Sequence, residues 1–337
     1  MRPWRGAAVG LLVALAQFGL AAQPATLAPP AEAPGADIER WLMRLHEAPR
    51  NRAYVGTFVV TAGSDMSSAR IWHVGDGERQ MERVESLTGT ARTTFRRNDE
   101  VVTFLPANRT VVHETREALG LFPNLLKKAD ASVPRYYRLR SIGQGRVAGL
   151  EADIVQLLPV DGLRFGYQIW TEQKTGLMLK LQTLDTGGKV LEQAAFSELQ
   201  LEAPVSMAKL KALMDNTQGY QVVSPHLFKT TAQEEGWELG TAVPGFAPMR
   251  CYRRGEGAAA PGRSALQCVY SDGLASVSLF VEPFESNRHA RMLSAHPLSL
   301  GATSLRVRQV GPWCMTAVGE VPAQTLDRLM QAFEKKR

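Results

Sequence analysis

The feature that most constrains the fold of this chain is a series of short, strand-like runs between Tyr54 and Leu201. The runs are rich in β-branched and aromatic residues. Polar turn residues separate them, as at Gly63 after residues 57–61 and at Gly75 after residues 69–74. Such spacing is typical of strands that follow one another in an antiparallel meander. We therefore predict one long, strongly curved antiparallel sheet here, with its helices on one side.

Helical patterns flank this region. Before the sheet, apolar residues recur at helical spacing on one face, at Ile38, Trp41, Leu42 and Leu45. After residue 204 the strand pattern stops, and residues 205–235 are predicted to be a linker. Strand-like runs resume near Trp237 and end in a helix with apolar residues at Leu326, Leu329, Met330 and Phe333. The pattern predicts an α+β protein with a large domain at 36–204 and a smaller α+β domain at 236–337.

The N-terminus has the three parts of a secretory signal peptide. Residues 1–5 are basic, residues 6–20 are almost purely apolar, and small residues follow at Ala21 and Ala22. The apolar run is shorter than the ~20 residues that a membrane-spanning helix needs, although a retained anchor remains the alternative. We predict a signal peptide at 1–22, a Pro/Ala-rich disordered leader at 23–35, and a protein that works outside the cytoplasm.

The three cysteines, Cys251, Cys268 and Cys314, all lie in the last third of the chain. In an oxidising compartment two of them are expected to pair. Cys251 and Cys268 lie in adjacent strand-like runs, so a disulfide across that hairpin is the simplest prediction. A bridge that uses Cys314 remains open.

The sequence contains no motif for catalysis, a metal or a cofactor. HExxH, GxSxG and P-loop patterns are absent, and the six histidines lack metal-ligand spacing. Acidic residues such as Glu82, Glu85 and Asp161, the last near Arg164, are predicted to be solvated charges on the sheet. The net charge of +6 includes no Lys/Arg block, which argues against nucleic acid. We predict a protein that is not an enzyme and has no metal or cofactor.

Aromatic residues are spread over the predicted sheet, and two interpretations of them remain open. They fill the core between sheet and helices, or some of them line an apolar groove that binds apolar ligands. The residues are Tyr54, Phe58, Trp72, Phe104, Phe165, Tyr167 and Trp170.

Several stretches occur in the order and spacing of one known family. They are residues 54–59 (YVGTFV), 70–73 (RIWH), 164–170 (RFGYQIW), 269–278 (VYSDGLASVS) and 318–322 (VGEVP). Through them the chain resembles the RseB/MucB family, the periplasmic negative regulators of sigma-E (AlgU-type) factor activity. One departure is Thr88-Gly89, where the family pattern has Asp-Gly, which leaves the contacts of that turn open.

The resemblance implies a large domain similar to lipoprotein carriers, an unclosed and strongly curved antiparallel β-barrel with helices, followed by a smaller α+β domain. It implies binding to the periplasmic domain of a membrane-spanning anti-sigma factor of the RseA/MucA type. It also implies protection of that domain from regulated proteolysis, and release when a lipid or lipopolysaccharide fragment fills the groove. The seven aromatic residues above are then candidates for lining the groove.

Basic residues of the small domain, Arg253, Arg254 and Arg263, are candidates for contact with an acidic partner. A homo-oligomer remains open. The main alternative function is a periplasmic lipid or lipoprotein carrier, which would bind lipid without an anti-sigma partner. An envelope hydrolase with an unrecognised site and a purely structural module are further rivals.

Overall fold

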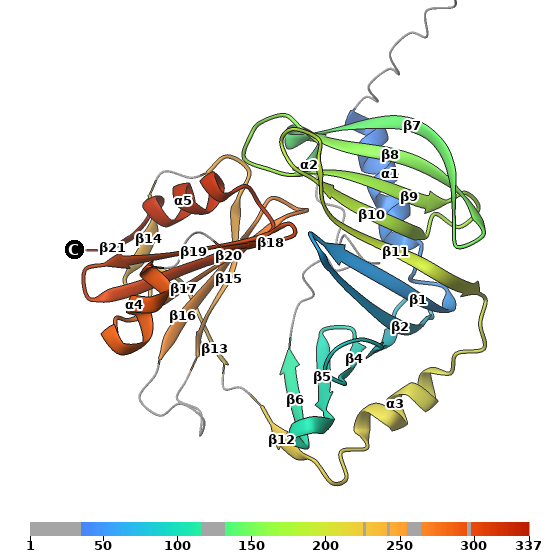
Figure 1. Cartoon of the computed structure of the whole chain (residues 1–337), viewed down its shortest axis with the longest axis horizontal. Coiled ribbons are helices and arrows are strands. Elements are labelled where there is room, and N and C mark those ends of the chain that lie inside the picture. Colours follow the sequence, from blue (N-terminus) through green and yellow to red (C-terminus); the bar gives the residue numbers. More distant parts are fainter. Residues whose placement is uncertain are drawn as a thin grey trace, which may run out of the picture. The chain divides into compact units, whose positions relative to one another are not determined.

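The structure, a computed structural model, describes residues 35–115, 132–224, 227–240, 243–254, 264–294 and 298–336 (Figure 1). The predicted signal peptide and nearly all of the predicted leader lie outside these residues, as does Arg263. Within the described ranges, no helix has the length and apolarity needed to cross a membrane.

The larger of the sheets has 12 strands in the order β12-β6-β5-β4-β3-β2-β1-β11-β10-β9-β8-β7. Its strands are β1 (Ala53–Ala62), β2 (Asp65–Gly75), β3 (Gln80–Ser86), β4 (Thr93–Arg97), β5 (Glu100–Leu105), β6 (Thr110–Thr115), β7 (Tyr137–Val147), β8 (Leu150–Pro159), β9 (Gly166–Glu172), β10 (Met178–Leu184), β11 (Val190–Leu201) and β12 (Gln221–Val223). All pairs are antiparallel except β12 with β6. The predicted antiparallel meander is confirmed, and the sheet is unclosed because β12 and β7 are its edges.

Gly56 and Asn98 determine the local geometry of the large sheet at a close contact between strands and at a turn. A Cβ atom on Gly56 would lie 2.7 Å from the ring of Phe196 and 2.8 Å from the carbonyl oxygen of Glu198. Gly56 therefore allows β1 and β11 to approach closely under an aromatic ring. Asn98 has a φ of 52° in the β4–β5 turn, and its Oδ1 accepts a hydrogen bond from the Gln80 backbone N–H at 3.0 Å.

Two helices cover opposite faces of the large sheet. Helix α1 (Gly35–Glu47) packs Ile38, Leu42 and Leu45 into one core cluster with residues of β7–β10, including Val155 and Ile169. Helix α3 (Met207–Asp215) packs into another cluster, with residues of β3–β6 such as Met81, Phe95, Phe104 and Val111.

The strand register shows that these clusters lie on different faces. Tyr54 pairs with His73 on the face of α1, so the neighbouring Trp72, which packs beneath α3, points to the other face. The prediction that the helices lie on one side is therefore wrong. The cause is the connector after residue 204, which was not expected to return to the sheet. Short helical segments also occur before this connector, at η1 (Pro106–Asn108) and α2 (Val133–Tyr136).

The second sheet has seven strands in the order β13-β15-β16-β17-β20-β19-β18. They are β13 (Leu227–Thr230), β15 (Ala247–Arg254), β16 (Ala265–Ser271), β17 (Ser276–Pro283), β18 (Leu298–Leu300), β19 (Thr303–Val310) and β20 (Trp313–Gly319). Helices α4 (Ser286–Ser294) and α5 (Ala323–Ala332) accompany it, and a separate two-stranded ladder joins β14 (Trp237–Leu239) to β21 (Phe333–Lys335). Leu326, Leu329 and Met330 of α5 pack against Val277, Leu279 and Met315 of the sheet. The expected smaller α+β region is therefore present.

The predicted disulfide is confirmed. Cys251 and Cys268 are directly opposite each other on β15 and β16, and a disulfide joins them. Cys314 is a buried free thiol, and burial is the main cause that raises its pKa.

The segment predicted as a linker is divided between the sheets. It supplies α3 and the edge strand β12 to the large sheet, and the edge strand β13 to the small one. Only residues 224–226 separate β12 from β13.

Candidate functional site

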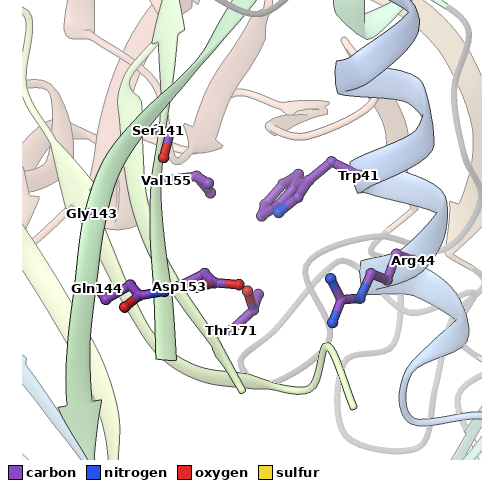
Figure 2. Close-up of a pocket in the computed structure, with 8 residues that line it drawn as sticks. All are labelled: Trp41, Arg44, Ser141, Gly143, Gln144, Asp153, Val155 and Thr171. Atoms are coloured by element: carbon purple, nitrogen blue, oxygen red, sulfur yellow. Dashed lines mark hydrogen bonds between the residues drawn. The ribbon is translucent and has the colours of Figure 1, made fainter. Parts of the chain in front are cut away.

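A pocket of about 590 Å³ lies between helix α1 and strands β7–β9 (Figure 2). The helix contributes Trp41 and Arg44, whose side chains extend toward the strands in Figure 2. The strands contribute Ser141, Gly143, Gln144, Asp153, Val155 and Thr171. A β-bulge between Ser141 and Gly143 interrupts the pairing of β7 with β8 at this place, and such bulges redirect side chains.

Hydrogen bonds hold one end of the pocket in place. The guanidinium Nη2 of Arg44 donates to the carbonyl oxygen of Gln173 at 2.6 Å. Asp153 accepts through Oδ1 only, from Nε2 of Gln173 at 3.0 Å and from Nε2 of Gln144 at 3.4 Å. These bonds hold the side chains of Asp153 and Arg44 in place at the pocket.

A second polar cluster joins the large sheet to the small one. Arg164, which precedes β9, has no exposed surface, and its Nε donates to Oδ2 of Asp272 at 2.7 Å. It also donates to Asp161 and to the carbonyl oxygen of Pro244. The hydroxyl of Tyr137 donates to the same Oδ2 of Asp272 at 2.9 Å.

The turn that carries Asp272 is itself fixed. Oδ1 of Asp272 accepts from the backbone N–H groups of Leu274 and Ala275, at 3.0 and 2.8 Å. Burial is the main cause that raises the pKa of Asp272, while these bonds and Arg164 oppose the rise. Burial also raises the pKa of Tyr137 well above its ordinary value, followed by the charge of Asp272, so this tyrosine remains a donor.

Each sheet places one leucine in the core of the other. Leu163, beside Arg164, packs in the small-sheet cluster with Val321 and Leu326. Leu274, from the β16–β17 turn of the small sheet, packs in the α1 cluster with Leu157 and Tyr167. Thr325 helps to hold Leu163 in the small-sheet core, because the Thr325 hydroxyl donates to the carbonyl oxygen of Leu163 at 2.7 Å.

A carboxylate pair lies at another contact between the sheets. The Ala302 backbone N–H in the β18–β19 turn donates to Oε2 of Glu192 on β11 at 3.4 Å. Glu320, at the end of β20, is partly buried, and burial followed by the charge of Glu192 raises its pKa to about 7. The charge of Glu320 in turn contributes to the raised pKa of Tyr167, after burial and Asp272.

The prediction of solvated charges at Glu82 and Glu85, and at Asp161 near Arg164, is wrong for Glu82 and for the neighbourhood of Arg164. Arg164 is fully buried, and Glu82 is 9% exposed beside the buried His73. Nδ1 of His73 lies 3.0 Å from Oε1 of Glu82, and Nε2 lies 2.8 Å from the carbonyl oxygen of Pro49. Glu85 stays partly exposed and pairs with Arg83 at 2.7 Å, as expected of a surface charge.

The seven aromatic groove candidates do not form one surface. Tyr54 and Phe58 are in a cluster on the α1 face, and Tyr167 packs beneath α1 itself. Trp72 and Phe104 pack with α3 on the other face. Trp170 is three residues from Tyr167 along β9, so it points away from that residue's face, and Phe165 is buried before the strand. None of the seven lines the pocket between α1 and β7–β9.

The basic candidates in the described residues have partners within the small-sheet part. Arg253 lies 3.7 Å from the carboxylate of Glu235. Arg254 donates to Gln267 at 3.2 Å and lies over the ring of Phe280. Among the described residues, no group of three or more His, Cys, Asp or Glu side chains could hold a metal ion.

Comparison with known proteins assigns the chain to a family. The MucB/RseB N-terminal domain model matches residues 37–214, and the MucB/RseB C-terminal domain model matches residues 231–334. The chain belongs to the MucB/RseB family. It is 31% identical to the sigma factor AlgU regulatory protein MucB of Pseudomonas aeruginosa, over 92% of each chain. It is 25% identical to the sigma-E factor regulatory protein RseB of Haemophilus influenzae, over 86% of this chain and 89% of that protein.

Solved structures agree with this assignment. The crystal structure of MucB in complex with MucA(peri) matches with a TM-score of 0.66 and 27% identity, over 90% of this chain and 100% of that one. The Pseudomonas aeruginosa MucA/MucB complex matches with a TM-score of 0.67 and 28% identity, over 89% and 99%. The family resemblance and the fold class expected from the sequence are confirmed.

Proposed function

We propose that this chain is a periplasmic regulator that binds the periplasmic domain of a membrane-spanning anti-sigma factor and shields it from regulated proteolysis. The observation that carries this proposal is the match to MucB in complex with MucA(peri), which extends through both sheets. A protein that only carried lipid would need no second sheet, and the contacts at Arg164 and Leu163 tie that sheet firmly to the first. In this role the chain binds and does not catalyse.

The direct test is calorimetric titration of the mature chain with the periplasmic domain of the anti-sigma factor from the same organism. We expect a saturable complex, and the bound domain should be cleaved more slowly by the protease that starts its degradation. Absence of binding to that domain, with lipid binding intact, would favour the carrier alternative instead. Sedimentation of the free chain in the same buffer would determine whether it forms a homo-oligomer.

Release by a lipid or lipopolysaccharide fragment is the second part of the proposal. Trp41 lines the pocket on α1, and the same helix packs through Leu42 and Leu45 into the cluster that contains Leu274. A ligand that moves α1 therefore acts on the turn that carries Asp272 and hence on the contact between the sheets. Burying an acyl chain contributes ~0.8 kcal/mol per methylene, whereas allosteric coupling typically requires ~1–3 kcal/mol. Only part of the free energy of ligand binding must therefore differ between the chain bound to the anti-sigma domain and the free chain.

A covalent lock between the sheets tests this release step. A Cβ atom on Gly301 would lie 2.7 Å from that of Ala62 on β1. Disulfides need ~3.5–4.5 Å between Cβ atoms, so a bridge between Ala62→Cys and Gly301→Cys requires a shift of about 1 Å. It also requires the backbone of residue 301, whose φ of 57° favours glycine, to accept a side chain. The locked chain should bind the anti-sigma domain but no longer release it when lipopolysaccharide is added. Each single cysteine variant serves as the control, and release from the locked chain would contradict the proposed movement.

Export supports the same role. Residues 1–22 are proposed to be removed during secretion. Mass spectrometry of the chain purified from the periplasmic fraction should find an N-terminus at Gln23, or at Ala22 if cleavage is one residue earlier. Chain with an intact Met1 in the membrane fraction would instead indicate a retained anchor.

A further inference from the structure

The pocket between α1 and β7–β9 presents several polar groups that have no partner. Among the described residues, the indole N–H of Trp41 and the hydroxyl of Ser141 make no hydrogen bond, although both residues line the pocket. The same is true of the hydroxyl of Thr171. Asp153 uses only one of its carboxylate oxygens, which leaves Oδ2 able to accept. The pocket therefore offers donors and acceptors to a ligand from several sides.

The charges of the lining disfavour an ionic ligand. Arg44 is the cation and Asp153 the anion among the eight lining residues, so they balance. A phosphate or carboxylate would meet the carboxylate of Asp153 along with the guanidinium of Arg44. A bare acyl chain is also a poor occupant, because it would remove water from these polar groups and give them no hydrogen bonds in return.

An aromatic ring and an aliphatic side chain complete the lining. Figure 2 shows the Trp41 indole extending from α1 toward the strands, on the side where Val155 lies. A flat indole with a polar N–H suits a ligand that has an apolar face and a polar edge. A pyranose ring has both, since its axial C–H bonds form the apolar face and its equatorial hydroxyls form the edge. A volume of about 590 Å³ falls within the range usual for small-molecule pockets.

We infer that this pocket binds a neutral saccharide ring, which stacks on Trp41 and donates hydroxyl hydrogen bonds to Asp153. The ring hydroxyls accept from Arg44 and from the indole N–H of Trp41, and exchange hydrogen bonds with Thr171 at the buried end. This inference deepens the release step of the proposed function. Saccharide binding itself does not depend on that function, whereas the consequence of binding, release of the anti-sigma domain, rests on it. The ligand that triggers release would then be recognised by its sugar and not by its acyl chain alone.

Nuclear magnetic resonance of the indole N–H groups tests the inference on the mature chain. The Trp41→Leu variant identifies the Trp41 indole signal by its disappearance, and leucine retains an apolar side chain on α1 that packs toward the strands. The probes are chitobiose and maltose as free glycans, octyl β-glucoside as a sugar with an alkyl chain, and decanoate and inorganic phosphate as ligands without a sugar. We expect the Trp41 signal to shift in a saturable manner with at least one free glycan, with a millimolar dissociation constant, and not with phosphate.

Matched variants distinguish the pocket from nonspecific effects. Asp153→Asn should weaken glycan binding by about tenfold, as the loss of one charged acceptor predicts. Asp65→Asn, at an exposed aspartate that begins β2, is the control for charge and should bind as the unaltered chain does. Thermal unfolding of every variant checks that the fold is retained. Saturable binding of decanoate with no shift by any sugar would overturn the inference, and so would unchanged glycan affinity in Asp153→Asn and Trp41→Leu.

Two further arms separate the sources of the sugar and the two proposals. Tighter binding of octyl β-glucoside than of maltose, the free glucose disaccharide, would identify the sugar head of a lipid as the source, whereas equal binding would identify a free glycan. Titration of Trp41→Leu with the anti-sigma domain should give unchanged affinity, because the pocket is proposed to govern release. If the unaltered chain binds glycan but not the anti-sigma domain, the proposed function fails while the saccharide site remains.

Discussion

Replacing Asp272 with alanine should destabilise the protein more than any other single change at the contact between the sheets. Asp272 has no exposed side-chain surface and is the fully buried carboxylate partner of Arg164, at 2.7 Å from Nε. The alanine variant leaves the guanidinium buried, and within the described residues its remaining acceptors are Asp161 and the carbonyl oxygen of Pro244. It also removes the acceptor of the Tyr137 hydroxyl.

Breaking a buried ion pair by removing one partner costs about 3–5 kcal/mol, because the other charge remains buried. Exposed substitutions elsewhere change stability by about 0.5 kcal/mol or less. Total stabilities of about 5–15 kcal/mol make the expected loss a large fraction of the whole. The double variant Arg164→Met with Asp272→Leu should recover the part of the loss that comes from the buried guanidinium, since methionine needs no partner. The Tyr137 hydroxyl and the Leu274 and Ala275 backbone N–H groups still lose their acceptor, so recovery is partial.

Equilibrium unfolding in urea, followed by circular dichroism and by tryptophan fluorescence, measures these losses. Asp65→Ala is the matched control, because Asp65 is exposed and lacks a hydrogen-bond or ion-pair partner among the described residues. In Asp272→Ala we also expect circular dichroism and tryptophan fluorescence to report two separate transitions. Without the Asp272 contacts, the packing of Leu163 and Leu274 in the core of the opposite sheet is not expected to hold the two sheets in one cooperative unit. A loss below about 1 kcal/mol, or no recovery in the double variant, would refute this account of the cluster.

Three further variants test individual contacts by thermal or urea unfolding. Because burial raises the pKa of Glu320 to about 7, stability should fall as the pH rises from about 4.5 to 7, by at most about 3 kcal/mol, and Glu320→Gln should remove that slope. Tyr54→Phe should leave the midpoint unchanged or raise it, because the buried Tyr54 hydroxyl has no hydrogen-bond partner among the described residues; a clear loss would indicate one. Gly56→Ala should cost about 1–3 kcal/mol by overpacking against Phe196, and an unchanged midpoint would contradict that close approach.

The architecture was largely predictable, because alternation and turn residues are local signals. The antiparallel meander, the α1 helix, the last helix and the Cys251–Cys268 disulfide all follow from residues that are close in the chain. The return of α3 to the large sheet was not predictable in this way. Its apolar residues Leu210 and Met214 show that it packs on something, but not on which face of which sheet.

The sequence already limits how many of the seven aromatic candidates could line one groove. Side chains alternate along a strand, so Tyr167 and Trp170, three residues apart, point to opposite faces. The pocket itself has no such signal, because its residues come from α1, β7, β8 and β9 and most of them are polar types that are common at solvated positions. Only the pairing of Ser141 with Val155 across a bulge, beneath Trp41, brings them together.

The buried Arg164 cluster shows why contacts between polar residues that are far apart in the chain are hard to predict from the sequence. Arg164 and Asp272 are 108 residues apart, and a third acceptor is a backbone carbonyl, which no residue type reveals. A charged residue is rarely buried without a partner, so surface exposure was the reasonable expectation for Arg164. Arg164 is not exposed because the turn of residues 161–164 inserts Leu163 into the small-sheet core, and the adjacent Arg164 is buried with it. The arginine is buried because the leucine is, and Asp161 and Asp272 are then required to neutralise it.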